Sequence, residues 1–374
     1  MSAPRILLSA GEASSDMYAA RLATALRSRA NAQMFGMGGP LMAEAGVELV
    51  ANYQEVAVTG ITEVLHKIPT VIGVQNRLKR EAQTRGAQLA VLVDSPGTHL
   101  GVARRMKQID VPVGYFIGPQ IWAWRPGRVR VVKRLVNRMV VIFPFEEKIY
   151  RDAGVPVNFV GHPLVDTVRV TMSREEFATR RGLDPSRPIV TILPGSRPNE
   201  IAQNYARVIA ACERLAQPGN VQFVHAAAHG LTPEFFMRHA RPTVKVTRVE
   251  GETYNALAAA DCAIVASGTA TVEAALLGTP MVVIYRVAPV TAGILRHMIR
   301  TPFIGMVNLI GGRLVVPELI QDKFTPEAVE KEVRRLLNSF SARNEVKAGL
   351  AEVRAKLGPG GAIERAADIF AGML

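Results

Sequence analysis

The 374-residue chain contains no run of eighteen apolar residues and only two cysteines. A helix needs about 20 mostly apolar residues to cross a bilayer, so no membrane span is expected. The opening RILL, followed by the polar GEASSD, is too short for a secretory signal. Cys212 and Cys262 lack CxxC or Cys/His ligand spacing, so we expect reduced core thiols. These absences favour a cytoplasmic protein without redox or zinc chemistry.

Several nucleotide-binding signatures are missing as well. The sequence has no GxGxxG in a dinucleotide context, no GxxxxGK[ST] and no DxD pair. Hydride transfer, P-loop phosphoryl transfer and a metal held on a nucleotide diphosphate by paired aspartates therefore lack support. We expect neither a metal site nor a cofactor. A transferase that works without a metal would instead neutralise a leaving diphosphate with a helix N-terminus and an arginine.

The net charge of +13 indicates an anionic partner, which can be nucleic acid, a membrane surface or a phosphorylated substrate. A basic nucleic-acid-binding protein is the non-enzyme alternative, although no aromatic-rich RNA-binding motif is present. A solvated cationic face without a dedicated partner is a further interpretation. If the basic segment is helical, Arg130, Arg134 and Arg138 share one face. Its cations, with no acid among them, are Arg125, Arg128, Arg130, Lys133, Arg134 and Arg138.

Short apolar runs alternate with amphipathic stretches, a pattern typical of an α/β fold with a doubly wound parallel sheet. The alternation begins at RILLSA and restarts at PIVTILPGS, after GHPLVDT. We therefore expect two Rossmann-like domains that face each other across a cleft, with a boundary near 163–172. The first, 1–165, would bind the acceptor and face a membrane, and the second, 166–340, would bind the donor. Helices in 341–374 would pack back on the first domain or on a partner subunit.

The segment 257–287 predicts a buried strand, a turn of small residues and a helix over 269–277. The turn consists of Ser267, Gly268 and Thr269, whose small side chains let backbone N–H groups approach a diphosphate. Glu273 lies one helical turn beyond Thr269, so it faces the same side and can accept hydrogen bonds from ribose hydroxyls. An ordinary βαβ crossover is the alternative interpretation.

A second candidate turn, Pro194-Gly195-Ser196-Arg197, follows another expected strand. Arg197 is suited to neutralising a leaving diphosphate. Glu200, three residues on, can orient the guanidinium or support the start of the next helix. The alternative is a helix cap with an incidental arginine.

Two carboxylates follow strands of the first half. Asp94 ends the run LAVLV, where partial desolvation would raise its pKa toward the range of a general base. Alternatively, Asp94 closes an Asx turn. Glu12 can bind acceptor hydroxyls, act as the base itself, or cap a helix that begins near Ser14. The histidines are interpreted as structural, since His162, His225 and His229 form no triad or ligand spacing.

Motifs spread over nearly the whole chain carry a family resemblance. They include AGEASSD (10–16), TGITEVL (59–65), VDSP (93–96), GPQIWAWR (118–125), FPFE (143–146), GHPL (161–164), LPGSRPNEI (193–201), ASGTATVEAALLGTPMVVIYR (266–286) and VNLIGGRLVVPELIQ (307–321). The chain resembles the lipid A disaccharide synthases, inverting glycosyltransferases with the two-domain GT-B fold. Other GT-B enzymes, such as UDP-N-acetylglucosamine transferases or epimerases, share the SGTxxxE turn but are not expected to combine WAWR with GEAS.

The resemblance implies a reaction and a set of residues. UDP-2,3-diacylglucosamine would glycosylate the 6-hydroxyl of 2,3-diacylglucosamine 1-phosphate, giving a β-1,6 disaccharide and UDP in a cytoplasmic enzyme at the inner membrane. We expect no nucleic-acid partner, because such a role does not explain a cleft between two sheets, and the sequence leaves both a monomer and a homodimer open. Asp94 matches the family aspartate of VDSP, with Glu12 as the other candidate base. The implied donor contacts are Ser196, Arg197, Ser267, Gly268, Thr269 and Glu273, with Tyr285, Arg286, Asn308, Glu318 and Gln321 nearby.

The chain departs from the family pattern at three places. Ser15 stands where glycine is usual, so the first turn has less room for an acyl sugar. Pro96-Gly97-Thr98-His99 replaces PDFN, which leaves acceptor contacts there unassigned, and Val307 replaces the proline before Asn308.

Acyl chains need an apolar surface, and 61–80 offers apolar residues at helical spacing, flanked by cations. This segment either dips into a membrane interface or is a core-facing helix kinked at Pro69. The expected acceptor and membrane contacts are Ser14, Val64, Leu65, Ile68, Arg125 and Arg128.

Overall fold

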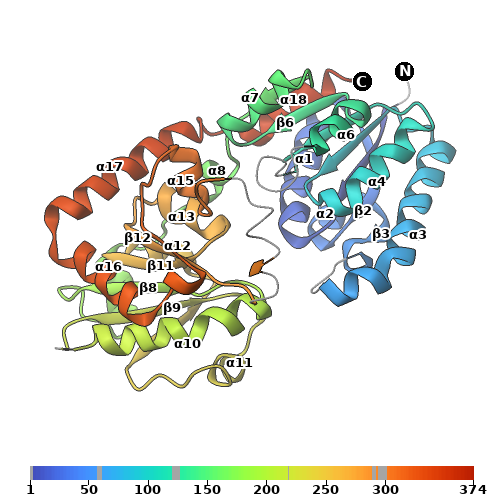
Figure 1. Cartoon of the computed structure of the whole chain (residues 1–374). Coiled ribbons are helices and arrows are strands. Elements are labelled where there is room, and N and C mark those ends of the chain that lie inside the picture. The colour runs from blue at the N-terminus through green and yellow to red at the C-terminus, as the bar shows by residue number, and fades with distance from the viewer. Residues whose placement is uncertain (1–2, 57–60, 120–126, 218, 289–291, 294–300) are drawn as a thin grey trace. The chain divides into compact units, whose positions relative to one another are not determined.

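The computed structural model describes residues 3–56, 61–119, 127–217, 219–288, 292–293 and 301–374, without side chains at 61–66. The chain forms two compact units, Met1–Pro163 with Leu357–Leu374, and Leu164–Lys356 (Figure 1). No helix in these described stretches is long and apolar enough to cross a membrane.

The first unit is built on a seven-stranded sheet in the order β3-β2-β1-β4-β5-β6-β7, and every described pair is parallel. The strands are β1 (Arg5–Ala10), β2 (Gln33–Gly38), β3 (Glu48–Asn52), β4 (Leu89–Val93), β5 (Val113–Phe116), β6 (Arg138–Val141) and β7 (Val157–Phe159). The helices are α1 (Ala13–Ala30), α2 (Pro40–Glu44), α3 (Ile61–Arg85), α4 (Pro96–Lys107), α6 (Arg128–Leu135), α7 (Pro144–Asp152) and α18 (Ala362–Ala371), with a 3₁₀ turn at η1 (Tyr53–Glu55).

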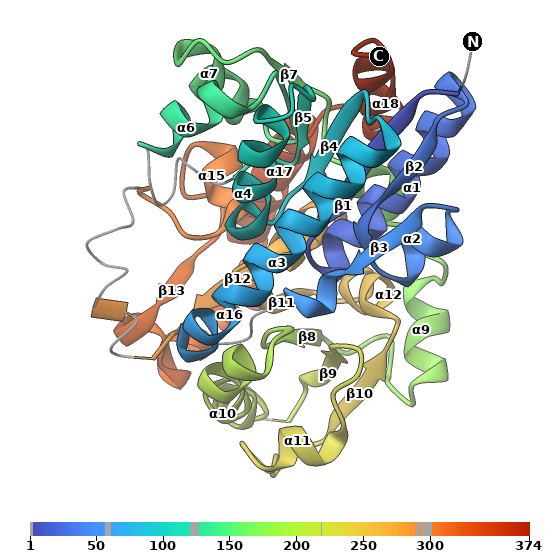
Figure 2. The same ribbon diagram turned by 90° about the vertical axis from the view of Figure 1, so that its right-hand side faces the viewer.

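Helices cover both faces of this sheet. Alternate strand residues such as Leu92 and Tyr115 pack with α3, α4 and α6, and Figure 2 shows α3 and α4 side by side over that face. On the opposite face, a Cβ at Gly114 would meet Phe370 of α18 at 2.5 Å, and α18 packs beside α1. The strands are therefore buried on both sides, as expected of a parallel sheet.

The second unit holds a six-stranded parallel sheet in the order β10-β9-β8-β11-β12-β13. Its strands are β8 (Ile189–Leu193), β9 (Gln222–Ala227), β10 (Val246–Glu250), β11 (Cys262–Ala266), β12 (Met281–Tyr285) and β13 (Glu318–Ile320). Its helices are α8 (Leu164–Thr167), α9 (Arg174–Arg180), α10 (Pro198–Leu215), α11 (Pro233–Met237), α12 (Thr253–Ala258), α13 (Thr269–Leu276), α15 (Met306–Gly311), α16 (Pro326–Asn338) and α17 (Phe340–Lys356), with a 3₁₀ turn at η2 (Gln321–Lys323).

The predicted doubly wound parallel architecture is confirmed in both units. In each sheet the strand order reverses at one point, between β1 and β4 and between β8 and β11. Ligands of such sheets bind beyond the carboxyl ends of the strands at this point. The condition that Arg130, Arg134 and Arg138 lie in one helix is not met, because α6 ends at Leu135 and Arg138 begins β6.

Candidate active site

The reversal point of the first sheet brings two loops into contact. Gly11 follows β1 and Ser95 follows β4, and a Cβ added to Gly11 would lie 2.5 Å from the Ser95 Cβ. Glycine is therefore required at position 11 for the two loops to meet. Asp94, the residue directly after β4, lies partly buried at this junction.

Asp94 and Ser95 both adopt left-handed backbone conformations, with φ of +53° and +49°. The Asp94 carbonyl oxygen accepts hydrogen bonds from His99 Nδ1 and from the Tyr115 hydroxyl, each at 2.7 Å. The Asp94 N–H donates to the Phe116 carbonyl at 2.9 Å, so the β4–β5 ladder extends to this residue. Hydrogen bonds therefore restrain both the N–H and the carbonyl group of Asp94, the candidate base.

Glu12, the second candidate base, occupies the N-cap position of α1, the place that the helix-capping alternative gives it. Its carboxylate accepts a hydrogen bond from the Ser14 hydroxyl at 2.7 Å. Ser15 is buried, and its hydroxyl accepts from the backbone N–H groups of Gly11 and Glu12. Ser15, which stands where glycine is usual, therefore stabilises the turn between β1 and α1 through hydrogen bonds to its backbone.

In the second unit, the loop after β8 carries the arginine expected to meet a diphosphate. Arg197 is the N-cap residue of α10, and its side chain is 72% exposed. Glu200 accepts from the backbone N–H groups of Ser196 and Arg197 and lies 3.3 Å from the Arg197 guanidinium. Both roles considered for Glu200 are therefore present, support of the helix start and orientation of the arginine. Burial raises the pKa of Tyr285, the negative charge of Glu200 raises it further, and the positive charge of Arg197 lowers it.

The turn after β11 leaves backbone accessible. Gly268, at the N-cap of α13, has a φ of +157°, and a Cβ added there would meet nothing within 4 Å. The backbone N–H and the hydroxyl of Thr271 both donate hydrogen bonds to the Gly268 carbonyl, which closes the first turn of the helix. A group with two negative charges would find both open space and the positive end of a helix dipole at Gly268 and Thr269.

Glu273 lies one turn further along α13. Its carboxylate accepts a hydrogen bond from the Tyr254 hydroxyl at 3.1 Å, while burial raises its pKa. The tyrosine fixes one carboxylate oxygen. A fixed, partly desolvated carboxylate at this position suits recognition of neighbouring hydroxyls.

The remaining candidate donor residues hold the surrounding loops in place. Ser267 donates its hydroxyl to the Ile304 carbonyl at 3.1 Å, and the Glu318 carboxylate accepts from the N–H groups of Ile304 and Gly305. Asn308 is fully buried and bonds to Glu318 at 2.7 Å. Through these bonds, Ser267, Glu318 and Asn308 hold the backbone at 304–305 next to the turn.

A similar pair supports the end of β12. Arg286 donates to the Gln321 carbonyl at 3.0 Å, and the Gln321 side chain accepts from the Val287 N–H at 2.9 Å. Val307, at the position of the usual proline, is buried in the first turn of α15. The candidates that end or follow β8, β11 and β12 therefore lie at the carboxyl ends of those strands, whereas Glu318 begins β13, Asn308 lies in α15 and Gln321 follows β13.

Two residues near this edge were not predicted. Burial, and to a smaller extent the positive charge of Arg286, lowers the pKa of Arg207 on α10. Tyr254, which orients Glu273, lies in α12. Sequence spacing gave no signal for either, because each approaches its partner from a different helix or loop.

The acceptor and membrane candidates are only partly described. Ile68 on α3 is 45% exposed, and Arg128 is half-buried at the start of α6. The backbone of Val64 and Leu65 is helical, whereas their side chains and the whole of Arg125 lie outside the described residues. In the described part, no three His, Cys, Asp or Glu side chains are grouped to hold a metal ion.

Comparison with known proteins gives consistent sequence matches over the full chain. The family described as lipid-A-disaccharide synthetase matches residues 6–365. The lipid-A-disaccharide synthase of Myxococcus xanthus is 44% identical over 368 residues, which cover 98% of this chain and 96% of that protein. The synthase of Geobacter metallireducens is 43% identical over 374 residues, with 99% and 97% covered.

Solved structures are similar in fold at much lower identity. MurG of Acinetobacter baumannii has a TM-score of 0.62 and 14% identity, with 98% of both chains covered. The UDP-GlcNAc 2-epimerase of Neisseria meningitidis, solved with UDP-GlcNAc, has a TM-score of 0.66 and 11% identity, again with 98% of both chains covered. These similarities establish a GT-B-like fold with two parallel sheets, and at such identities they show nothing finer.

Proposed function

Since this chain belongs to the lipid-A-disaccharide synthase family, we propose a role for each part of the site in that enzyme's reaction. The chain is a glycosyltransferase of lipid A biosynthesis. The observation that carries this function is the match of one family over residues 6–365. The substrates that the family implies are UDP-2,3-diacylglucosamine and 2,3-diacylglucosamine 1-phosphate.

In the proposed mechanism, the Asp94 carboxylate removes the proton from the acceptor 6-hydroxyl. The 6-oxygen attacks the anomeric carbon of the donor, a new carbon–oxygen bond forms with inversion, and the bond from that carbon to the diphosphate oxygen breaks. The proton remains on Asp94, and UDP leaves with the electron pair. Asp94 is preferred over Glu12 because Asp94 matches the family aspartate of VDSP, whereas Glu12 occupies a helix-cap position.

On the donor side, we assign the diphosphate to the start of α13 and to Arg197, with Arg207 and Arg286 adding positive charge. The ribose hydroxyls are assigned to Glu273, which Tyr254 orients. Ser267, Glu318, Asn308 and Gln321 are assigned a supporting role, because each of them makes a hydrogen bond to a backbone group of the surrounding loops. Charge stabilisation of this type needs no divalent metal.

The direct experiment incubates the purified protein with both acylated sugars and measures UDP and disaccharide together. Equimolar UDP and β-linked disaccharide are expected, and chelator should not reduce the rate. Epimerisation of a UDP-sugar without disaccharide would instead favour the GT-B epimerase alternative. Release of UDP only in the presence of a different acceptor would favour another transferase.

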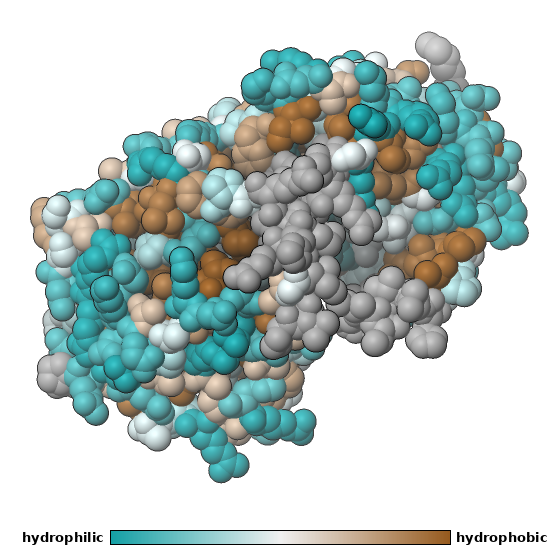
Figure 3. Space-filling model, in the orientation of Figure 1, coloured by the Kyte–Doolittle hydropathy of each residue, from teal (hydrophilic) through white to brown (hydrophobic). Residues whose placement is uncertain are grey.

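We also propose that the first unit attaches to an anionic membrane from the cytoplasmic side. On α3, Ile68 and Ile72 are one helical turn apart and are 45% and 44% exposed, whereas Val74 and Leu78 face the core. Figure 3 shows hydrophobic surface over the region of α3 among hydrophilic residues. The exposed cations of α6 include Lys133 and Arg134. Apolar insertion and attraction to anionic lipid would act together.

Vesicle sedimentation tests this attachment. The wild type should sediment with anionic vesicles, and a fraction should resist salt, because salt screens charges but not apolar insertion. The double variant Ile68→Glu, Ile72→Glu should lose that fraction. Leu314→Glu, at another exposed apolar position in the second unit, is the matched control and should not. Equal binding of the double variant and the wild type would reject the assignment.

A homodimer that does not exchange its C-terminal helices would have to use surfaces other than the α1–α18 contact. Arg29 of α1 pairs with Glu364 and Asp368 of α18 in the same chain, so that face of α18 is already covered.

A further inference from the structure

We propose that His99 and Tyr115 are positioning residues for Asp94, acting through its main-chain carbonyl. The proposal rests on the role of Asp94 as the base given above. It goes beyond that role because neither residue would touch a substrate: both approach Asp94 from the interior of the first unit, and both are fully buried.

The two donors come from separate elements. Tyr115 lies in the middle of β5, next to β4, and its hydroxyl donates to the Asp94 carbonyl at 2.7 Å. His99 lies in the first half of α4, and its Nδ1 contacts the same oxygen at 2.7 Å. A carbonyl oxygen has two lone pairs, so the two donors saturate it.

The protonation state of His99 follows from its surroundings. Burial lowers the pKa of the imidazole to about 4, so the ring is neutral near pH 7. A carbonyl can only accept, and therefore the single ring proton resides on Nδ1. Nε2 then accepts from the Ser9 hydroxyl, 2.9 Å away and buried in β1. A continuous chain of hydrogen bonds thus links β1 through α4 to the residue after β4.

This anchoring explains how two consecutive non-glycine residues stay in the left-handed region. For L-residues that conformation is disfavoured, and it persists only when surrounding contacts impose it. With the Asp94 carbonyl drawn inward, the planar trans peptide turns the Ser95 N–H the opposite way. The same backbone geometry fixes the Cβ direction of Asp94. Loss of the donors would let the peptide rotate and move the carboxylate away from its working position.

The test compares Tyr115→Phe with Tyr150→Phe. Tyr150 is also a buried tyrosine of the first unit, and its hydroxyl donates to the Pro119 carbonyl at 3.1 Å, so both variants delete one hydroxyl-to-carbonyl hydrogen bond. Tyr115→Phe should lower kcat by roughly 10- to 100-fold, the loss typical of a small misplacement of a reacting group. UDP affinity should not change, and Tyr150→Phe should retain the wild-type kcat.

A second arm separates positioning from loss of stability. In an Asp94→Asn background, single-turnover rates with and without Tyr115→Phe should be equal, because a residue that acts through the carboxylate has nothing left to position. A wild-type kcat for Tyr115→Phe, or the same fold-loss in both backgrounds, would overturn the proposal. If Tyr115→Phe does not fold, the double variant Ser9→Ala, His99→Leu replaces it in both backgrounds. This variant removes the His99 donor, and the Ser9 substitution avoids a buried hydroxyl without a partner. Full activity of Asp94→Asn itself would instead reject the assigned base.

Discussion

At the scale of single residues, the donor side is organised by side chains that orient other side chains. Tyr254 fixes Glu273, Glu200 contacts Arg197, and Gln321 holds the segment after β12. An unoriented carboxylate or guanidinium loses side-chain entropy when it binds, so orientation in advance raises affinity. Substitution of a residue that orients a nucleotide-contacting side chain should therefore also weaken nucleotide binding.

We predict that Glu273→Ala weakens UDP by roughly 10- to 100-fold and Tyr254→Phe by about 5-fold, the difference between a lost charged hydrogen bond and a lost neutral one. Isothermal titration with UDP measures both. Tyr205→Phe is the control, as another largely buried tyrosine of the second unit. An unchanged UDP affinity for Glu273→Ala would remove it from the ribose assignment.

Arg197→Ala should discriminate between ligands. It should weaken UDP by roughly 10-fold or more while leaving uridine affinity unchanged, because only UDP carries the charge that the guanidinium binds. Arg180→Ala is the control, since Arg180 is an exposed arginine of the same unit paired with Glu176. Equal effects on UDP and uridine would show that Arg197 does not meet the diphosphate.

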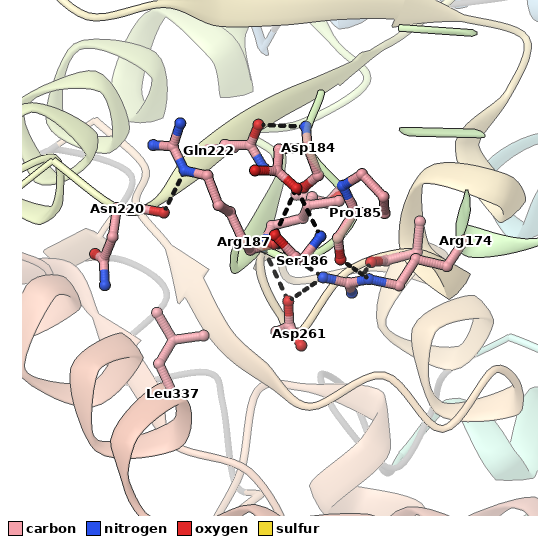
Figure 4. Close-up of polar contacts among 12 residues, drawn as sticks. Arg174, Asp184, Pro185, Ser186, Arg187, Asn220, Gln222, Asp261 and Leu337 are labelled. Atoms are coloured by element: carbon pink, nitrogen blue, oxygen red, sulfur yellow. Dashed lines mark hydrogen bonds and ion pairs between the residues drawn. The ribbon is translucent and has the colours of Figure 1, made fainter. Parts of the chain in front are cut away.

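At the scale of elements, the second sheet is tied together at its amino-terminal edge by one arginine. Arg174 of α9 bonds to the carbonyls of Pro185, Ala259 and Arg187 and to the Asp261 carboxylate (Figure 4). Asp261 also accepts from the Ile189 N–H at the start of β8. These contacts join α9, β8 and the loop before β11 at the edge opposite the proposed donor site.

Arg174→Ala should lower the free energy of unfolding by about 2–4 kcal/mol, because it leaves several carbonyls and one carboxylate without their donor. UDP affinity at a temperature where the variant is folded should remain unchanged. Arg174→Lys should recover only part of the stability, since an ammonium cannot copy the guanidinium fork. Urea unfolding checks this, and equal stability of Arg174→Ala and wild type would contradict it.

The sequence predicted the elements with strong apolar runs and missed those without. LAVLV and CAIVAS appear as β4 and β11, whereas β3 and the three-residue β13 carry mixed sequences whose pairing depends on the neighbouring strand. The helix predicted around Pro69 continues through it as α3. Most of the predicted donor residues end or follow β8, β11 and β12, and the carboxyl ends of these parallel strands share one edge. Contacts made from the interior, such as those of His99, Tyr115 and Tyr254, had no signature in spacing.

At the scale of the whole molecule, buried histidines link folding to pH in both units. Burial lowers the pKa of His99 to about 4, of His162 to about 3 and of His225 to about 4. In the unfolded chain these groups titrate near 6.5. Between these values the unfolded state binds protons that the folded state excludes, so the free energy of unfolding must fall as the pH falls.

The expected loss is about 1.4 kcal/mol per pH unit for each such histidine as the pH falls below about 6.5. Urea unfolding between pH 7.5 and 5, above most carboxylate titrations, measures it. His225→Gln should make the dependence shallower. His229→Gln should not, because the His229 side chain is 98% exposed. A stability that does not change over this range would mean that these rings are not buried in solution.

The most direct measurement of the central claim is kcat of Asp94→Asn with both acylated sugars. The substitution keeps the size of the side chain and removes the base, so kcat should fall by roughly 100- to 10,000-fold. UDP affinity and the melting temperature should match those of the wild type. A kcat within about threefold of wild type, equivalent to a barrier change under about 1 kcal/mol, would contradict the account.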